Sequence, residues 1–322
     1  MIFRTRRFSK NLFIFGICAC ALWIFARSVF HCQSSQNDSA RNVENNKKDY
    51  HFSTNLLIVV LSAPSHKEVR DVIRQTWASK PPLEVKIRFV VGVKHLPLNV
   101  EADLKNEQQL HNDLISLEKF EDSYNALTMK LIETFKFVNQ HVRFNFLMKV
   151  DEDSFVRVDK VSDELLSKPQ ERLYWGFFDG RAHVKKSGKW EERDYVLCDR
   201  YLPYALGGGY VLSKDLITYV AENSHLFSIF KSEDASLGTW LGPLNIHRSH
   251  DTNFDTEFVS RGCFNSYIVT HKKSPDDLKE LQNNMIKLGQ LCTQEKRTRL
   301  SYEYDWTVSP TKCCERKDPS IP

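Results

Sequence analysis

The chain has 322 residues and a formal net charge of +4 at pH 7, and 41% of its residues are hydrophobic while 27% are charged. This composition is typical of a globular protein that buries a real core, in one large domain with appendages or in two small domains. Because the charge is mild and no long basic run lies beyond the N-terminus, we expect no nucleic acid partner.

An apolar run near the N-terminus predicts a membrane anchor. Four basic residues within residues 1–10 precede fifteen uncharged, mostly apolar residues (12–26), and the run continues past Arg27. Since Arg27 can snorkel and early secretory membranes are thin, we predict a cytosolic tail (1–10) and a transmembrane signal-anchor (11–30) with the remainder in the lumen. The alternative is a cleaved signal peptide, with small residues at a cleavage site only around residues 19–21.

The segments beyond the anchor suit a lumenal protein. Residues 31–54 are rich in Ser, Asn, Gln and charge, which predicts a flexible stem, and Asn37 begins a glycosylation sequon. In the body, residues 55–322, disulfides are expected without a deducible connectivity. A zinc site is the alternative, but no C-x-x-C or H-x-x-x-H spacing supports it. The five body cysteines are Cys198, Cys263, Cys292, Cys313 and Cys314.

The first half of the body alternates strand and helix patterns. Three alternations predict an α/β fold with a mainly parallel sheet covered by helices on both faces. Asp122 or Ser123 is expected to cap the third helix. Apolar runs predict strands at residues 55–61, 85–93 and 144–150, and helical spacing predicts helices at 66–78, 99–114 and 122–140.

The first helix is expected to carry a basic face. Arg70, Arg74 and Trp77 are spaced i, i+4 and i+7, so they share one face. Such a face can hold a diphosphate or stack a flat base. The alternative is a solvated basic stripe with a half-buried tryptophan.

Acids follow the third strand. Asp151 and Asp153 form the only Asp-x-Asp of the chain, directly after the apolar run 144–150. In open α/β sheets ligands bind at the carboxyl ends of strands, so both carboxylates are positioned to face one divalent cation. The alternative is a polar exit from the strand.

Three successive glycines mark the second half of the chain. Gly207, Gly208 and Gly209 let the backbone approach a ligand closely, and the flanking Tyr204 and Tyr210 offer ring faces and hydroxyls to a sugar. The alternative is a flexible turn.

The remaining patterns complete the α/β series. Glu233 and Asp234 fall in the first turn of a predicted helix, where the helix dipole alone explains acids, and Ser213 is expected to start another helix. His271 follows the last predicted strand. Further expected elements are a helix at 159–167, an aromatic-rich run at 172–178, a basic hairpin-like segment at 184–190, strands at 244–247 and 266–270, and a helix at 275–288.

Taken in order, six of these motifs resemble the β-1,3-glycosyltransferase family, inverting enzymes of GT-A fold that use a nucleotide sugar. Glu152 stands where members often have Asp, and Asn125-Ala126-Leu127 lacks a sequon of some relatives. The motifs are Arg70-x-x-x-Arg74-x-Thr76-Trp77, Asp122-x-Tyr124-x-x-Leu127-Thr128-x-Lys130, Lys149-Val150-Asp151-Glu152-Asp153, Pro203-Tyr204-x-x-Gly207-Gly208-Gly209-Tyr210, Glu233-Asp234 and His271.

The resemblance implies a role for each matching residue. Asp234 would be the general base, with Glu233 as the alternative, and Mn²⁺ would be held by Asp151, Asp153 and His271. UDP-sugar contacts would come from Arg70, Arg74, Trp77, Lys130 and Asp151. Gly208, Gly209, Tyr204 and Trp175 would line the donor or acceptor sugar cleft.

Other segments resemble the branch of this family that builds the glycosaminoglycan linkage region. These are residues 172–178, 202–213, 236–241 and 304–306, with Cys313-Cys314. The resemblance implies UDP-galactose as donor, a glycosylated proteoglycan core protein as acceptor and a Golgi membrane location. Alternatives are another donor, such as UDP-N-acetylglucosamine, or a non-catalytic carbohydrate-binding ectodomain with Ca²⁺. Calcium loops recruit more oxygen ligands than residues 154–156 supply.

Overall fold

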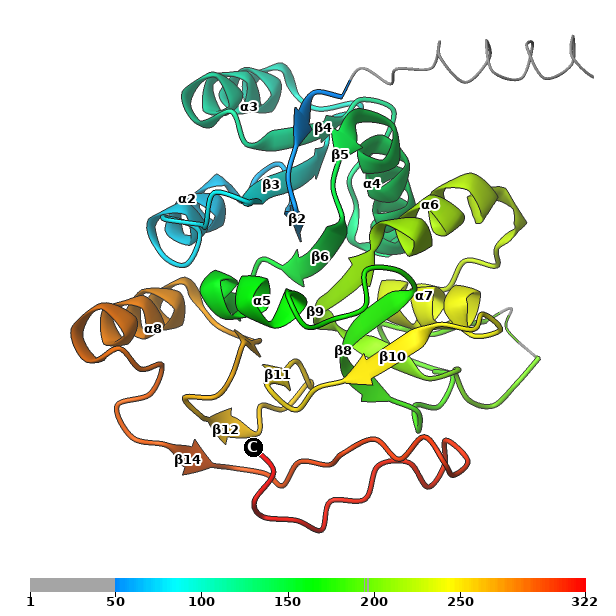
Figure 1. The fold of residues 1–322 in the computed structure, drawn as a ribbon. Helices are drawn as coiled ribbons and strands as arrows, with labels where there is room; N and C mark the ends of the chain where they lie inside the picture. Colours follow the sequence, from blue (N-terminus) through cyan, green and yellow to red (C-terminus); the bar gives the residue numbers. More distant parts are fainter. Residues whose placement is uncertain (1–49, 194, 196) are drawn as a thin grey trace, which may run out of the picture. The chain divides into compact units, whose positions relative to one another are not determined.

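The computed structural model describes residues 50–193, 195 and 197–322, and residues 50–322 fold as one compact unit (Figure 1). The predicted cytosolic tail, the membrane anchor, the sequon at Asn37 and the stem up to residue 49 lie outside the described residues. Within the described part, no helix is both long enough and apolar enough to cross a bilayer.

A seven-stranded sheet forms the centre, in the order β10-β8-β9-β6-β2-β3-β4. Strand β2 runs parallel to β3 and β6, β3 runs parallel to β4, and β8 runs parallel to β10, whereas β9 is antiparallel to both β6 and β8. The predicted mainly parallel sheet is confirmed. The strands are β2 Leu56–Leu61, β3 Val85–Gly92, β4 Leu114–Leu117, β6 Phe146–Asp151, β8 Leu173–Asp179, β9 Tyr204–Ser213 and β10 His247–His250.

Helices flank this sheet in two groups. Helix α4 contacts α6 and α7, and α7 also contacts β9, while α2 contacts α8. Figure 1 shows α4, α6 and α7 to the right of the strands, with α2 and α8 to the left. The helices are α2 Lys67–Gln75, α3 Leu98–His111, α4 Leu127–His141, α5 Val158–Leu165, α6 Lys214–Asn223, α7 Glu233–Leu241 and α8 Pro275–Leu288, with short 3-10 turns η1 Tyr124–Ala126 and η2 Ser224–Leu226.

Small sheets attach the remaining segments. Strand β13 lies between β11 and β7, and this three-stranded sheet joins the C-terminal region to the segment that follows the Asp-x-Asp. The pairs are β1 Phe52–Ser53 with β5 Val142–Arg143, β11 Phe254–Asp255 and β7 Phe155–Val156 with β13 Val269–Thr270, and β12 Gly262–Cys263 with β14 Lys296–Arg297.

Several predicted boundaries are wrong for identifiable reasons. Strand β1 lies among the last residues of the expected stem and pairs with β5. The helix expected to reach residue 114 ends at His111, because Asn112 is left-handed with φ 49°, and residues 114–117 then form β4. Helix α4 begins at Leu127, after a 3-10 turn, so neither Asp122 nor Ser123 caps it.

Two expected features take other forms. The glycine-rich stretch is neither a turn nor a loop: it lies within β9, a central strand of the sheet. Residues 184–190 contain no strand, but the chain turns back at Gly188, where φ is +84°, and the Glu192 N–H donates to Lys185 O at 2.8 Å. The helix at 275–288 and the helix start after Ser213 are confirmed. The strand expected at 244–247 lies instead at His247–His250, and the strand expected at 266–270 is shortened to Val269–Thr270.

The body forms two disulfides, Cys263–Cys292 and the vicinal pair Cys313–Cys314. Among the cysteines of the described part, Cys198 is exposed and free. Disulfides were therefore correctly expected, and the structure supplies the connectivity.

Candidate active site

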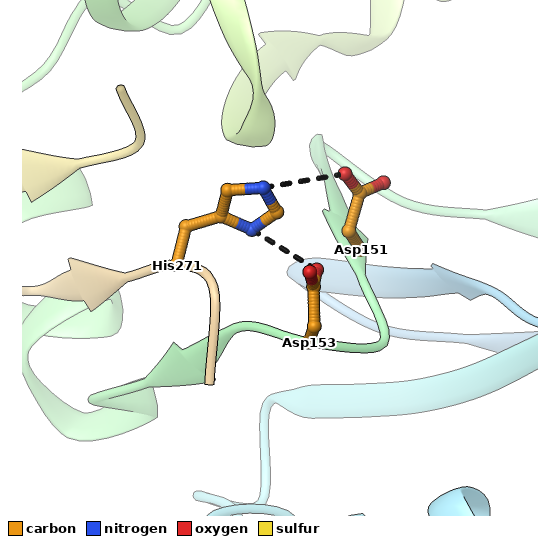
Figure 2. A group of neighbouring side chains, drawn as sticks. All are labelled: Asp151, Asp153 and His271. Carbon is orange, nitrogen blue, oxygen red and sulfur yellow. Dashed lines mark ion pairs between the residues drawn. The ribbon is translucent and has the colours of Figure 1, made fainter. Parts of the chain in front are cut away.

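Two acids and a histidine come together at the carboxyl end of β6 (Figure 2). The ligand atoms of Asp151, Asp153 and His271 all lie within 4.8 Å of one another. His271 Nδ1 is 3.1 Å from Asp153 Oδ1, and Nε2 is 3.9 Å from Asp151 Oδ2. Two carboxylates and one imidazole are donors that suit Mn²⁺ and similar divalent cations, so the residues present fit a metal ion of this class.

The local chain path fixes these three residues. The pairing of β13 with β7 aligns Thr270 with Phe155, which brings the following His271 beside the acids. The backbone N–H of Lys273 donates to Asp153 O at 2.8 Å, closing the gap between the two segments. His271 is buried, whereas Asp151 and Asp153 are partly exposed, so the cluster opens to solvent on its acidic side.

The glycines of β9 admit neighbouring protein groups. A Cβ on Gly208 would lie 2.6 Å from His271 Cγ, and a Cβ on Gly209 would lie 3.1 Å from a Val269 methyl. A Cβ on Gly207 would lie 3.1 Å from carboxylate oxygens of both Glu233 and Asp234. The close approach to the glycine backbone is present, and in this structure the approaching groups are His271, Val269 and the acids of α7.

Asp234 is the accessible member of the acidic pair that starts α7. It is partly exposed, its Oδ2 accepts the Gly207 N–H at 2.8 Å, and its Oδ1 accepts the Ala235 N–H at 2.8 Å and the Ser232 hydroxyl. Burial raises the pKa of Asp234 above its ordinary value, against the opposing hydrogen bond from Ser232. A carboxylate with a raised pKa in a partly exposed residue is suited to accept a proton.

Glu233 is buried and both of its oxygens have partners. Oε1 accepts from Lys149 Nζ, and Oε2 accepts the Asp234 N–H at 2.6 Å. Burial raises the pKa of Glu233 to about 7, although the charge of Lys149 opposes this shift. The two adjacent acids, which the sequence could not distinguish, therefore differ in exposure and in bonding.

Lys149 belongs to the motif Lys149-Val150-Asp151-Glu152-Asp153, but its place in the sequence predicts no role for it. It lies in β6, is fully buried, and its Nζ is 2.7 Å from both Asp151 Oδ1 and Gly207 O. A charged residue inside an apolar strand, two positions before the acids, is the signal that could have singled it out.

Arg70 and Arg74 form an internal network instead of an open basic face. Arg70 is fully buried and donates to Glu107 at 2.7 and 2.8 Å and to Ala63 O at 2.6 Å. Arg74 donates to Asp113 at 2.8 Å and to Glu107 at 2.6 Å. Trp77 is buried, and its Nε1 has no hydrogen-bond partner among the described residues.

Lys130 is likewise used internally. Its buried Nζ donates to Ser62 O at 2.7 Å and to Asp122, whose carboxylate also accepts the Gly92 N–H at 3.0 Å. Ser62 follows β2, whose last residue pairs with Asp151. Lys130 and Arg70 thus both hold the loop that begins beside Asp151.

The two aromatic residues predicted for a sugar cleft differ in position. Trp175 has no exposed surface and its Nε1 donates to Asp251 at 2.9 Å, so its ring is unavailable as a platform. Tyr204 is partly exposed at the start of β9. Burial raises the pKa of Tyr204 well above its ordinary value, and the nearby charges of Asp234 and Asp179 add to the shift.

Comparison with known proteins finds similarity to galactosyltransferases. Residues 68–252 match the family model described as Galactosyltransferase. The mouse (Mus musculus) protein β-1,3-galactosyltransferase 6 is 45% identical over 270 residues, which cover 82% of this chain and 83% of that protein. Hydroxyproline O-galactosyltransferase GALT2 of Arabidopsis thaliana is 32% identical over 248 residues, covering 74% of this chain but 36% of the plant protein.

Solved structures offer only distant likenesses. The mannosyltransferase PcManGT from Pyrobaculum calidifontis, in complex with GDP-Man and Mn²⁺, is 12% identical with a TM-score of 0.35, covering 70% of this chain and 65% of that one. The WbbM bifunctional glycosyltransferase is 14% identical with a TM-score of 0.38, covering 62% of this chain and 39% of that one.

Proposed function

This chain belongs to the galactosyltransferase family, and we propose that on a GT-A-type fold it transfers galactose from UDP-α-galactose to the 3-hydroxyl of an acceptor sugar, with inversion. The observation that carries the proposal is the pair of adjacent glycines in β9. Gly207 contacts Asp234 and Gly208 contacts His271. Lys149 Nζ links the two groups, because it bonds both Asp151 Oδ1 at 2.7 Å and Glu233, the neighbour of Asp234, so a proton acceptor and a candidate metal cluster are supported close together.

In the proposed reaction the acceptor 3-hydroxyl oxygen bonds to C1 of galactose while the bond from C1 to the UDP oxygen breaks. Asp234 accepts the hydroxyl proton as the general base. The residue is partly exposed, so an acceptor hydroxyl can reach it. Asp151, Asp153 and His271 would hold Mn²⁺, whose positive charge, when bound, stabilises the departing diphosphate. Lys130 and Arg70 support the donor side by fixing the loop after β2.

For the acceptor we propose galactosyl-β-1,4-xylosyl-serine of proteoglycan core proteins, which makes galactose the third sugar of the linkage tetrasaccharide. The support is the close resemblance of residues 172–178, 202–213 and 304–306 to galactosyltransferase II of that pathway. The same proposal places the chain in the Golgi membrane as a single-pass type II protein with a lumenal catalytic unit.

The proposed donor, UDP-galactose, also has competitors, since relatives of this chain are named for different donors. A Xenopus tropicalis relative, 28% identical over 199 residues that cover 40% of its length, is named UDP-GalNAc:β-1,3-N-acetylgalactosaminyltransferase 2. UDP-N-acetylgalactosamine and UDP-N-acetylglucosamine are therefore the competing donors to test.

The test is a transfer assay of the purified full chain. It offers UDP-galactose and the two competing donors to galactosyl-β-1,4-xyloside, with and without Mn²⁺, and NMR identifies the linkage formed. We expect a β-1,3-linked galactose product that requires the metal. Preference for another donor would overturn the choice of galactose, and binding of the xyloside without transfer or hydrolysis would support the carbohydrate-binding alternative.

A further inference from the structure

Lys149 is a charged residue in the least accessible part of the sheet. It lies between Met148 and Val150 in β6, and all three have no exposed surface. A buried ammonium is strongly unfavourable unless it is paired and hydrogen-bonded, and well-packed apolar residues often replace buried ion pairs without loss of stability. Fold stability alone therefore does not account for a lysine here.

The three acceptors of Lys149 come from three different elements. Asp151 lies at the end of β6, Gly207 O belongs to β9, and Glu233 is the first residue of α7. A lysine ammonium has three N–H donors, so the three acceptors match its capacity. Lys149 thus forms a rigid tripod between the metal-ligating edge and the helix that carries Asp234.

Two of these contacts lead directly to Asp234. Gly207 accepts from Lys149 through its carbonyl and donates its N–H to Asp234 Oδ2 at 2.8 Å. Glu233 accepts from Lys149 through Oε1 and from the Asp234 N–H through Oε2 at 2.6 Å. A shift of the ammonium therefore moves Gly207, one of the donors to the Asp234 carboxylate, and Glu233, which holds the Asp234 backbone N–H.

We propose that Lys149 is a positioning residue that sets the distance and orientation between Asp234 and the Asp151 side of the site. This inference rests on the proposed function, in which Asp234 takes the acceptor proton and Asp151 faces the donor. Misplacement of reacting groups by about 1 Å costs on the order of 10²-fold in rate. The competing explanation is that Lys149 only neutralises the buried charge of Glu233.

The variants are chosen to separate these explanations. Lys149→Met removes all three bonds but leaves Glu233 buried without its cation, which endangers folding. The double variant Lys149→Met/Glu233→Gln removes both charges and is the fold-tolerant test. Glu233→Gln alone keeps an oxygen that can accept from Lys149, and it serves as the reference for the double variant. Leu104→Ala, in α3 and buried, is the control for destabilisation remote from the site.

Steady-state kinetics of the full chain tests positioning. We expect the double variant to lose about 10²-fold in kcat relative to Glu233→Gln, with KM for the acceptor changed less than about threefold. Leu104→Ala keeps its kcat per folded molecule. A double variant as active as Glu233→Gln would overturn the inference, while a wild-type chain that transfers no galactose would overturn the proposed function instead.

Hydrogen–deuterium exchange without ligands gives a second readout that needs no activity. We expect faster exchange in peptides covering residues 204–213 and 232–241 in the double variant than in Glu233→Gln, because the supports of Asp234 are loosened. Leu104→Ala leaves both peptides at their wild-type rates. Unchanged exchange in the double variant would overturn the positioning role.

Discussion

Glu233 and Asp234 are adjacent carboxylates in different surroundings. The side chain of Glu233 is 5% exposed and ends on Lys149, while Asp234 is held by backbone N–H groups and remains partly open. Both acids lie in the first turn of α7, where the helix dipole favours negative charge. The dipole explains why acids are tolerated there, but the difference in exposure is what assigns the proton acceptor in our proposal.

Replacing Asp234 tests that assignment. Asp234→Asn keeps the shape and the acceptor oxygen for the Gly207 N–H, but removes the basic oxygen. We expect transfer to fall by about 10³-fold or more, while UDP binding measured by calorimetry stays within about threefold. Transfer that survives in this variant would move the base to Glu233 or elsewhere.

The raised pKa of Glu233 has a consequence for stability. Burial raises this pKa from 4.5 to about 7, so the folded state favours the neutral acid more than the unfolded state does. The stabilisation that comes from the raised pKa of Glu233 is fully present below pH 4.5 and is lost as the pH rises through about 7.

Thermal unfolding checks this sign. We expect the Tm of Glu233→Gln minus that of the wild type to become more positive between pH 5 and 7.5, because only the wild type loses this contribution. Glu280→Gln, on an exposed surface of α8, is the control and should leave the difference flat. A difference that falls with pH would show that Lys149 keeps Glu233 ionised.

At the scale of elements, β9 joins the two halves of the site. It is antiparallel to β6 on one side and β8 on the other, and its glycines let α7 and His271 approach the sheet. Three successive glycines weaken a strand, so their presence in the middle of a sheet reflects the side chains that must fit against them.

Gly208→Ala is the sharpest test of that fit. The new Cβ would meet His271 Cγ at 2.6 Å, so the imidazole must leave its place beside the acids. In our proposal His271 is a metal ligand, so we expect Mn²⁺-dependent UDP affinity to fall at least about tenfold, as it should also do in Asp153→Ala, which removes another proposed ligand.

Gly209→Ala is the matched control for this variant. Its new Cβ meets a Val269 methyl at 3.1 Å, which strains the same strand without touching His271. It should lower Tm while keeping metal-dependent binding. Normal binding in Gly208→Ala would show that His271 is not a ligand.

Elements with strong local patterns were predictable from the sequence. Every residue of β2 is buried, which produces the continuous apolar run, and Pro275 with the capping residue Ser274 marks the start of α8. Strand β4, by contrast, has only four residues and follows a helix directly, so its pattern merges with that of α3. Short edge strands owe their form to the neighbouring strand, which local sequence does not reveal.

Some parts of the candidate site were also predictable from the sequence, and others were not. The sheet-edge rule and the order of motifs pointed to Asp151, Asp153 and His271, and the structure brings these three together. The burial of Arg70 depends on Glu107, which is 37 residues away. Helical spacing shows which residues share a face but not which residues that face contacts. The ion pairs of Arg70 and Arg74 could therefore not be predicted from the sequence.

At the scale of the whole folded unit, the C-terminal tail is part of the core. Tyr302 donates to Phe178 O at 2.8 Å, and Arg261, which is fully buried, donates to Ser301 Oγ at 2.6 Å. Figure 1 shows the tail running along the lower edge, next to β12 and β14. Its aromatic side chains pack against Phe177 and Phe178, near the carboxyl end of β8.

The two disulfides should contribute very differently to the stability of this unit. Cys263–Cys292 spans a separation of 29 residues, and a loop of that size corresponds to about 3–4 kcal/mol of lost chain entropy in the unfolded state. Cys313–Cys314 joins neighbours, so it constrains almost no additional chain. The ranking of the two bonds thus follows from their spacing in the sequence.

Chemical denaturation of paired alanine variants tests this ranking. We expect Cys263→Ala/Cys292→Ala to lower the unfolding free energy by about 3–4 kcal/mol. Cys313→Ala/Cys314→Ala should lose roughly 1–2 kcal/mol, from the packing of two buried side chains in the tail. Equal losses would mean that the vicinal bond holds the tail against β8 in a way that loop entropy does not describe, and the tail would then be the element that limits stability.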